Sequence, residues 1–229
     1  MTQAKIDVRV FLFDIDGTLL STKGVGRGAL SQAMLDEFGV AHPDSDVVFS
    51  GRTDRSLLME LLQRNGLEVT EEHCRRLRDR YVSLMGGHLA RQGGVVLPGI
   101  RALLTDLFRR DALELAVMTG NLPETATQKL AHFDLRQWFA WISGGSLHVE
   151  RDDLARRTAE IIARRYGNSV TEVVVVGDTP ADIRCGHAIG AKTIAVATGE
   201  FSIESLTAEN PTKTFADFSQ TDEVLAALL

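Results

Sequence analysis

The chain alternates short, continuously apolar runs with stretches of helical periodicity, and this alternation limits the folds it can adopt. The apolar runs cover residues 8–13, 113–118, 173–176 and 193–196, and the helical stretches cover 100–110, 124–133, 154–166 and 182–189. A continuous apolar run fits a strand that is buried on both faces. Such strands, when they alternate with helices, favour a parallel sheet with helices on both sides. The pattern predicts an α/β fold with a doubly wound parallel sheet.

The segment between the first two apolar runs is too long for a simple connection from strand to helix. It shows helical periodicity at 27–38, 55–65 and 71–92 and no clear strand pattern. Glycines at both ends, including Gly93 and Gly94, are typical of a boundary. Because the segment has apolar positions of its own, we expect an inserted helical domain. The predicted division is a core of residues 1–20 and 95–229 and a helical cap of residues 21–94.

Charge and composition indicate which kinds of partner the protein binds and in which cellular compartment it is found. The formal net charge is −6, and no basic field attracts nucleic acid or an anionic membrane. No run approaches the ~20 apolar residues of a membrane span, and residues 1–7 do not resemble a signal peptide. Cys74 and Cys185 lie far apart, which favours reduced thiols. We expect a cytoplasmic monomer or homodimer that binds neither nucleic acid nor membrane.

Two carboxylates, Asp14 and Asp16, directly follow the first apolar run. An unpaired buried charge is costly unless a cation or a hydrogen-bond network compensates it. A metal-assisted reaction explains the pair better than a solubilising or helix-capping role does. In a parallel sheet the carboxyl ends of the strands meet in one crevice, so we expect Thr119 and Asp178 to lie beside these acids.

The motifs, in this order, resemble the haloacid dehalogenase superfamily. They are DxDGT at 14–18, a hydroxyl residue at Thr119, a basic residue, and GDTxxD at 177–182. The helical insert resembles the cap of the phosphoglycolate phosphatase and β-phosphoglucomutase-like branch. The resemblance implies a Rossmann-like core with an inserted α-helical cap. It also implies a Mg²⁺-dependent phosphatase that hydrolyses a small phosphorylated metabolite through an aspartyl-phosphate, with phosphoglycolate-like hydrolysis as the default of this branch.

Three alternatives to the phosphatase stay open at this stage. A phosphomutase of the β-phosphoglucomutase type would keep all of these motifs. A 2-haloacid dehalogenase needs neither Mg²⁺ nor an acid at the second position, so Asp16 and Asp178 speak against it. A non-catalytic phospho-binding module has no use for Asp16 or for a large cap.

The resemblance assigns chemical roles to the acids. Asp14 would attack phosphorus, which splits one displacement into two. Asp16 would protonate the leaving oxygen and later take a proton from water. Asp14, the backbone carbonyl of Asp16 and Asp178 would bind Mg²⁺, which prefers oxygen ligands.

A second group of residues is expected to bind the phosphate. Thr119 and the backbone amides of Gly120 and Asn121 would hold phosphate oxygens at a helix N-terminus. Thr18 would donate a hydrogen bond to a phosphate oxygen or to nearby backbone. Arg151 would offset charge in the transition state.

Three of these assignments have a plain structural alternative. Arg151 departs from the superfamily, where this residue is most often a Lys before Pro, but it keeps the charge; it could also be an ordinary solvated residue. Asp182 would orient Thr119 or a metal-bound water, or else lie on the helix surface. Arg52, in a loop that resembles the cap loop facing the active site, would contact the substrate. Otherwise it is a surface residue beside a helix capped by Thr53 or Asp54.

Overall fold

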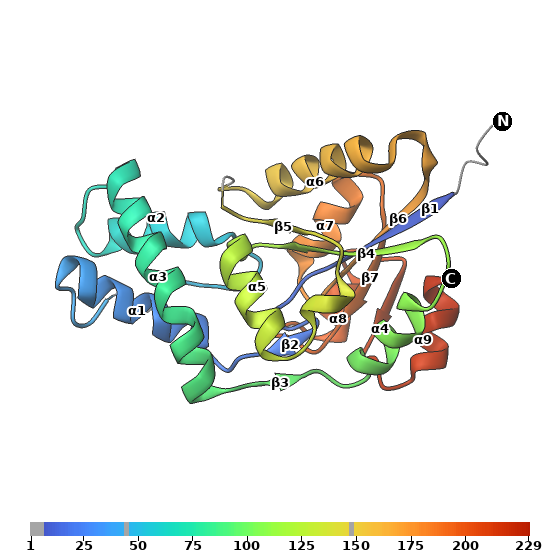
Figure 1. Cartoon of the computed structure of the whole chain (residues 1–229), viewed down its shortest axis with the longest axis horizontal. Coiled ribbons are helices and arrows are strands. Elements are labelled where there is room, and N and C mark those ends of the chain that lie inside the picture. The colour runs from blue at the N-terminus through green and yellow to red at the C-terminus, as the bar shows by residue number, and fades with distance from the viewer. Residues whose placement is uncertain (1–6, 44–45, 147–148) are drawn as a thin grey trace.

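The computed structural model describes residues 7–43, 46–146 and 149–229, and its centre is a parallel sheet (Figure 1). Within these residues the sheet has six strands in the order β5-β4-β1-β6-β7-β8. The strands are β1 (Val8–Phe13), β4 (Leu113–Thr119), β5 (Ile142–Gly144), β6 (Val170–Gly177), β7 (Lys192–Val196) and β8 (Lys213–Phe215). All neighbouring pairs are parallel. The predicted α/β fold class is confirmed.

Strand β1 lies in the middle of the sheet, and its side chains alternate between two apolar layers. Phe11 and Phe13 pack into one core, while Val10 and Leu12 pack into the other. This is why the run is continuously apolar: a strand with a helix layer on each face must bury both of its sides. The strand order reverses beside β1, because β4 pairs with one edge of it and β6 with the other. A crevice for a ligand is expected at such a point.

The helices of the core form a layer on each face of the sheet (Figure 1). They are α4 (Ile100–Phe108), α5 (Pro123–His132), α6 (Arg151–Tyr166), α7 (Pro180–Ala188), α8 (Ile203–Thr207) and α9 (Thr221–Leu228). One apolar core includes α4, α5 and α9, and another includes α6 and α7. Two single turns, η1 (Arg136–Trp138) and η2 (Gly167–Ser169), lie in the connections.

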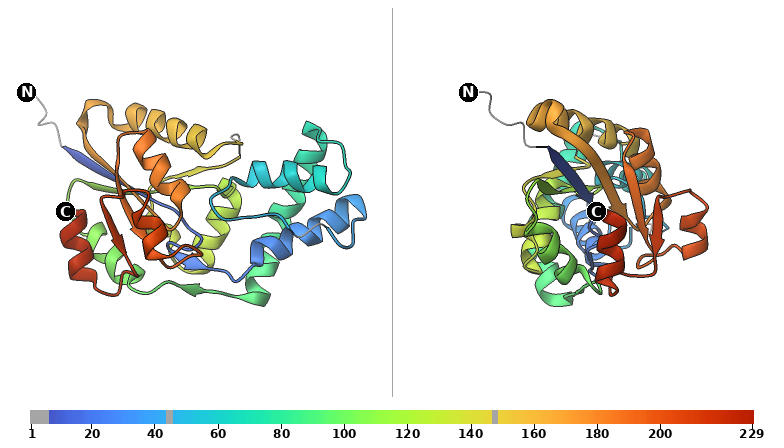
Figure 2. Two further views of the ribbon diagram at one scale, coloured as in Figure 1. Left: turned by 180° about the vertical axis from the view of Figure 1, so that it is seen from behind. Right: turned by 90° about the vertical axis from the view of Figure 1, so that its right-hand side faces the viewer.

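Three helices form a separate bundle at one end of the molecule (Figure 2). They are α1 (Val25–Phe38), α2 (Asp54–Arg64) and α3 (Glu71–Gln92), which share their own buried cluster around Tyr81. The chain enters and leaves the bundle through a short antiparallel ribbon of β2 (Leu20–Ser21) and β3 (Val95–Val96). We call this bundle the cap. The boundaries at 20/21 and 94/95 stay a prediction.

The starts of several helices follow from capping side chains. The hydroxyl of Thr53 accepts from the Ser56 amide at the start of α2, which is one of the two N-caps considered from the sequence. Thr179 and Asp182 form a reciprocal capping box at the start of α7, with Pro180 in the first turn.

Among the described residues, no helix combines the length and apolar character needed to cross a bilayer. Cys74 and Cys185 are buried free thiols on α3 and α7.

Candidate active site

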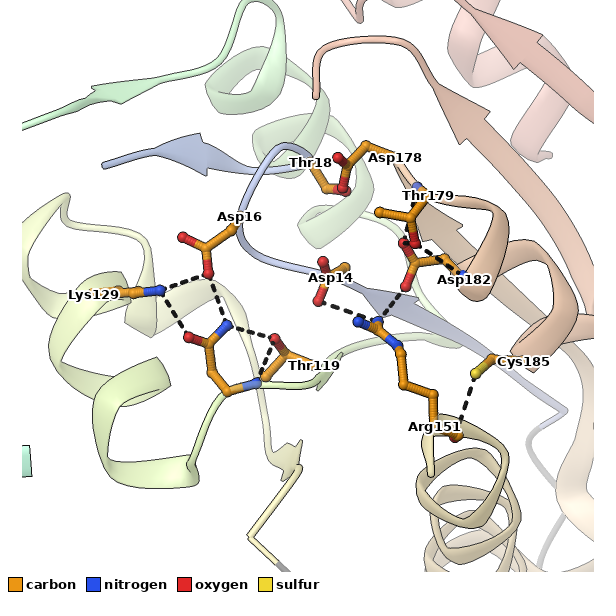
Figure 3. A network of polar contacts seen from close by, with 11 residues as sticks. Asp14, Asp16, Thr18, Thr119, Lys129, Arg151, Asp178, Thr179, Asp182 and Cys185 are labelled. Atoms are coloured by element: carbon orange, nitrogen blue, oxygen red, sulfur yellow. Dashed lines mark hydrogen bonds and ion pairs between the residues drawn. The ribbon is translucent and has the colours of Figure 1, made fainter. Parts of the chain in front are cut away.

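A cavity of about 440 Å³ lies at the carboxyl ends of β1, β4 and β6, beneath the cap. Most of the residues expected at the site line it, namely Asp14, Asp16, Arg52, Thr119, Gly120, Asn121, Arg151 and Asp178. Thr18 and Asp182 are buried and lie behind this lining. The parallel sheet therefore brings motifs that lie far apart in the sequence to one place, and Figure 3 shows the polar contacts between them.

Arg151, the first residue of α6, is buried between two carboxylates (Figure 3). Its Nη2 lies 3.6 Å from Oδ1 of Asp14 and forms an ion pair with Oδ1 of Asp182. Burial opposes the charge of Arg151, but Asp182 and Asp14 outweigh it and raise the pKa of the guanidinium. The alternative of a solvated surface residue is therefore wrong for Arg151, whose charge faces Asp14.

Asp14, Asp178 and Asp182 form a buried acidic cluster in which one oxygen from each lies within 4.8 Å of the others. Burial and the carboxylate of Asp182 raise the pKa of Asp14 to about 7, although Arg151 lowers it. Burial and the same neighbouring carboxylates raise the pKa of Asp178 well above its ordinary value. Within the described chain, Oδ1 of Asp14 is buried without a hydrogen-bond partner. The cluster thus carries more negative charge than its one guanidinium neutralises.

Asp178 is held in a tight backbone cradle at the end of β6. A Cβ on Gly17 would lie 2.2 Å from Oδ2 of Asp178, and one on Gly199 would lie 1.8 Å from the same oxygen. Gly17 also has a φ of +82°, which other residues rarely adopt. The Thr18 hydroxyl donates to Oδ1 of Asp178 at 3.0 Å. The partner of Thr18 in the structure is therefore Asp178, whereas a phosphate oxygen or nearby backbone was expected from the sequence.

Among the described side chains Asp182 contacts Arg151 and not Thr119, whereas the expected contact with a metal-bound water stays a prediction. Its Oδ2 accepts from the amide of Thr179 at 3.1 Å and from the Thr179 hydroxyl at 2.7 Å, and its Oδ1 faces Arg151. Both oxygens are therefore engaged. With 1% of its surface exposed, Asp182 is not a helix-surface residue either. Its position fixes the orientation of Arg151 toward Asp14.

Asp16 lies in a second network on the other side of Asp14 (Figure 3). The Asn121 side-chain amide donates to Oδ2 of Asp16 at 2.8 Å and to the Thr119 hydroxyl at 2.9 Å. Lys129 Nζ donates to the same Oδ2 at 2.6 Å and to Oδ1 of Asn121 at 2.7 Å. Sequence reasoning missed Lys129, which stands in the last turn of α5 and outside every motif.

A signal for Lys129 was present in the helical pattern. The apolar stripe of α5 contains Ala126, Leu130 and Phe133, and Lys129 falls on the same face. A charge on the buried face of an amphipathic helix needs a partner. The pattern marks Lys129 as a buried cation, but only the folded chain shows that the partner is Asp16.

The Asp54 side chain, which belongs to the cap, accepts a hydrogen bond at the N-terminus of α5. Helix α5 begins at Pro123, and Oδ2 of Asp54 accepts from the Leu122 amide at 2.8 Å. The Asn121 amide donates to the Thr119 hydroxyl at 3.3 Å. Gly120 and Asn121 therefore directly precede the N-cap residue Leu122, and their expected role in binding phosphate stays a prediction.

Arg52 lines the cavity from the cap, as expected, but it has partners of its own. Its guanidinium forms an ion pair with Glu60 and donates from Nε to the Ser56 hydroxyl at 3.2 Å. Next to it, the amide of Asp54 donates to the carbonyl of Gly120 at 2.7 Å. The loop of residues 51–54 thus contacts the core through its backbone while Arg52 faces the cavity.

The buried carboxylate of Asp54 predicts a pH-dependent gain in stability for Asp54→Asn. Burial, opposed by Lys129, raises the pKa of Asp54 from 3.8 to about 6. A raised pKa in the folded state stabilises the fold below the unfolded pKa, and this contribution is lost as pH rises through about 6. An Asn keeps an acceptor for the Leu122 amide, so the variant should gain relative to wild type between about pH 4 and pH 7.

Urea unfolding at pH 4.5 and pH 7.5 checks this prediction. The relative gain of Asp54→Asn has an upper limit of about 3 kcal/mol, because one pKa unit corresponds to about 1.4 kcal/mol. Thr127→Ala, at an exposed and uncharged residue of α5, is the control and should have the same effect on stability at both pH values. A relative gain that is the same at both pH values would contradict the prediction.

Comparison with known proteins agrees with this arrangement. Residues 11–196 match the family model of haloacid dehalogenase-like hydrolases. A phosphoglycolate phosphatase of Aquifex aeolicus is 28% identical over 208 residues, which cover 86% of this chain and 89% of the relative.

Two solved structures share the fold at lower identity. A predicted phosphoglycolate phosphatase from Haemophilus somnus superposes with a TM-score of 0.69 at 16% identity, covering 97% of this chain and 99% of that one. CbbY from Rhodobacter sphaeroides, in complex with phosphate, gives 0.61 at 20% identity over 93% and 96% of the two chains. The family match runs from within β1 to the end of β7 and includes the cap and the acidic cluster, so the chain belongs to the haloacid dehalogenase-like hydrolases.

Proposed function

We propose that this protein is a Mg²⁺-dependent phosphatase that hydrolyses a small phosphate monoester through an aspartyl-phosphate. The observation that carries the proposal is the position of Asp14. Its Oδ1 is buried without a hydrogen-bond partner in the described chain, at the end of the central strand and 3.6 Å from Arg151. An oxygen with a free lone pair, close to a fixed cation, is suited to attack a phosphorus atom.

The acidic cluster supports a divalent cation as part of this site. Burial, and after it the neighbouring carboxylates, raise the pKa values of Asp14 and Asp178, as expected where a positive charge is lacking. Asp14 and Asp178, with the backbone carbonyl of Asp16, would hold Mg²⁺, since these hard oxygen donors suit it. Both oxygens of Asp182 already have partners, so Asp182 stays behind this set. The bound cation would polarise the phosphoryl group and neutralise its charge.

The chain's own side chains would carry out two displacements. In the first, a carboxylate oxygen of Asp14 forms a bond to phosphorus as the bond to the leaving oxygen breaks, and Asp16 gives that oxygen a proton. In the second, Asp16 takes a proton from the attacking water, the bond from Asp14 to phosphorus breaks, and inorganic phosphate leaves. The same residue thus acts first as acid and then as base.

Phosphoryl oxygens would be bound between Thr119 and Arg151. The Thr119 hydroxyl accepts from the amide and the side chain of Asn121, so its own proton is available to an acceptor, which is Asp14 here and would be a phosphoryl oxygen when substrate is bound. Arg151, fixed by Asp182, offers guanidinium donors on the Asp14 side. Donors that are fixed before the reaction stabilise the charge of the transition state without reorganising. The Gly120 amide would add a backbone donor.

The cavity and the relatives support a small substrate of the phosphoglycolate type. Arg52 from the cap would contact the part of the substrate beyond the phosphate, after exchanging Glu60 for the ligand. The cap would close over the site and exclude water. A cytoplasmic enzyme acting on a phosphorylated metabolite fits this reading. Among the described residues, we find no feature that favours a phosphomutase separately.

Metal removal gives a direct test. The purified protein is incubated with a panel of small phosphate monoesters, phosphoglycolate included, and released phosphate is measured with Mg²⁺, with EDTA, and with EDTA followed by excess Mg²⁺. We expect release that EDTA abolishes and Mg²⁺ restores. Release that is unchanged in EDTA would refute the mechanism. Isomerised sugar phosphate without net release would instead favour the mutase.

A further inference from the structure

Lys129 is a buried cation that the reaction described above does not use. It stands in α5, and only 4% of its side chain is exposed, although it lines the cavity. Burying an ammonium group is costly unless nearby groups compensate its charge. The site already has a buried cation in Arg151, which faces Asp14 and Asp182. Lys129 therefore has some other role in the site.

Lys129 and Asn121 both donate hydrogen bonds to the same oxygen of Asp16. Lys129 Nζ and the Asn121 side-chain amide both donate to Oδ2 of Asp16, at 2.6 and 2.8 Å. In the part of the chain that the structure describes, no side chain donates to Oδ1 of Asp16. With 40% of its side chain exposed, Asp16 also lines the cavity. One oxygen of Asp16 is thus held and the other is left for the substrate.

Lys129 also fixes the orientation of Asn121. An ammonium group has only donors, so the carbonyl oxygen of Asn121 must face Lys129, as it does at 2.7 Å. The NH₂ of Asn121 must then face the opposite way, toward Asp16 and the Thr119 hydroxyl. Without the charge of Lys129, only the carboxylate of Asp16 would hold the Asn121 side chain in this orientation. Lys129 and Asp16 together therefore fix which end of the Asn121 amide donates and which accepts.

We propose that Lys129 is a positioning residue that holds Asp16, directly and through Asn121, so that its free oxygen meets the leaving group. The proposal rests on the proposed function, in which Asp16 passes a proton to the leaving oxygen. The two buried cations would then have different roles. Arg151 would bind the phosphoryl group beside Asp14, and Lys129 would orient Asp16 toward the leaving group.

A comparison of two leaving groups separates this role from a general structural one. The leaving group of an alkyl phosphate is a strongly basic alkoxide, which needs a proton from Asp16 to depart. The leaving group of p-nitrophenyl phosphate is p-nitrophenolate, a stable anion that departs without a proton. In Lys129→Met we expect leaving-group release in the first turnover to slow by about 100-fold for an alkyl phosphate, at the low end of what general acid catalysis contributes. For p-nitrophenyl phosphate we expect first-turnover release to slow by at most about threefold, since nucleophilic attack by Asp14 is untouched. Hydrolysis of the aspartyl-phosphate, in which Asp16 acts as base, is the same step for both substrates and does not enter this comparison.

Two further variants complete the experiment. Lys129→Arg keeps the charge and the donors, so its loss on the alkyl phosphate should be smaller than that of Lys129→Met. Lys213→Met, at an exposed lysine on β8, should match wild type on both substrates. If Lys129→Met does not fold, the selective loss is measured in Lys129→Gln, which removes the charge and keeps a polar group.

The outcomes distinguish the inference from the function on which it rests. Equal losses on both substrates, or no loss on either, would overturn the positioning role while the phosphatase activity stands. A wild-type protein that releases phosphate from neither substrate would overturn the proposed function, and the inference falls with it.

Discussion

Asp14→Asn should lower phosphate release by about 10⁴-fold or more, because the amide has no charged oxygen to attack phosphorus. The substitution keeps the shape of the side chain, so Arg151 and Asp178 should stay in place. The fold should become more stable at the same time. Burial and neighbouring carboxylates raise the pKa of Asp14 to about 7, which means that its ionised form is unfavourable in the folded protein above that pH. Phosphate release and urea unfolding at pH 8 measure the two effects.

Asp16→Asn is the matched control, since it removes an acid two residues away and leaves the nucleophile intact. With p-nitrophenyl phosphate it should still form the aspartyl-phosphate but hydrolyse it slowly, because no base activates the water. Intact-mass measurement of the quenched protein should find one added phosphoryl group in Asp16→Asn and none in Asp14→Asn. Phosphate release by Asp14→Asn at the wild-type rate would contradict the assignment of the nucleophile.

The sequence predicts the part of the site that lies at strand ends. Asp14, Thr119 and Asp178 each follow an apolar run, and the carboxyl ends of parallel strands meet at one edge of a sheet. Arg151 is proposed from the resemblance and the order of its motifs, and the structure places it at the start of α6, which precedes β6. For the three strand-end residues, local order along the chain and the topology of the sheet are enough to bring them together.

The other contacts depend on packing that no local pattern encodes. Lys129 meets Asp16 because α5 lies against the sheet in a particular rotation, and Asp54 meets α5 only because the cap docks there. Thr18 turns toward Asp178 because Gly17 bends the chain back on itself. Edge strands were missed for a different reason: β5 and β8 have three residues each, too few to show a period.

The second large expected effect is a loss of turnover in Gly120→Ala, because residues 51–54 of the cap pack closely against Gly120 of the core. A Cβ at Gly120 would lie 1.9 Å from the carbonyl oxygen of Arg52. The obstacle is backbone, so it cannot rotate away as a side chain can. The loop is also tied to the core by the bond from the Asp54 amide to the Gly120 carbonyl. The added methyl group must therefore push residues 51–54, and Arg52 with them, away from the cavity.

We expect Gly120→Ala to lower turnover by about 100-fold, which is the cost of displacing a positioning group by about 1 Å. Gly86→Ala, in the cap helix α3, is the matched control. There a Cβ would meet only Oε1 of Gln128 at 3.5 Å, an ordinary contact, and helical alanine is slightly stabilising. Steady-state kinetics and thermal unfolding of both variants separate a displaced loop from a weakened fold. Wild-type turnover in a folded Gly120→Ala would mean that the close approach of Arg52 to Gly120 is not needed during the reaction.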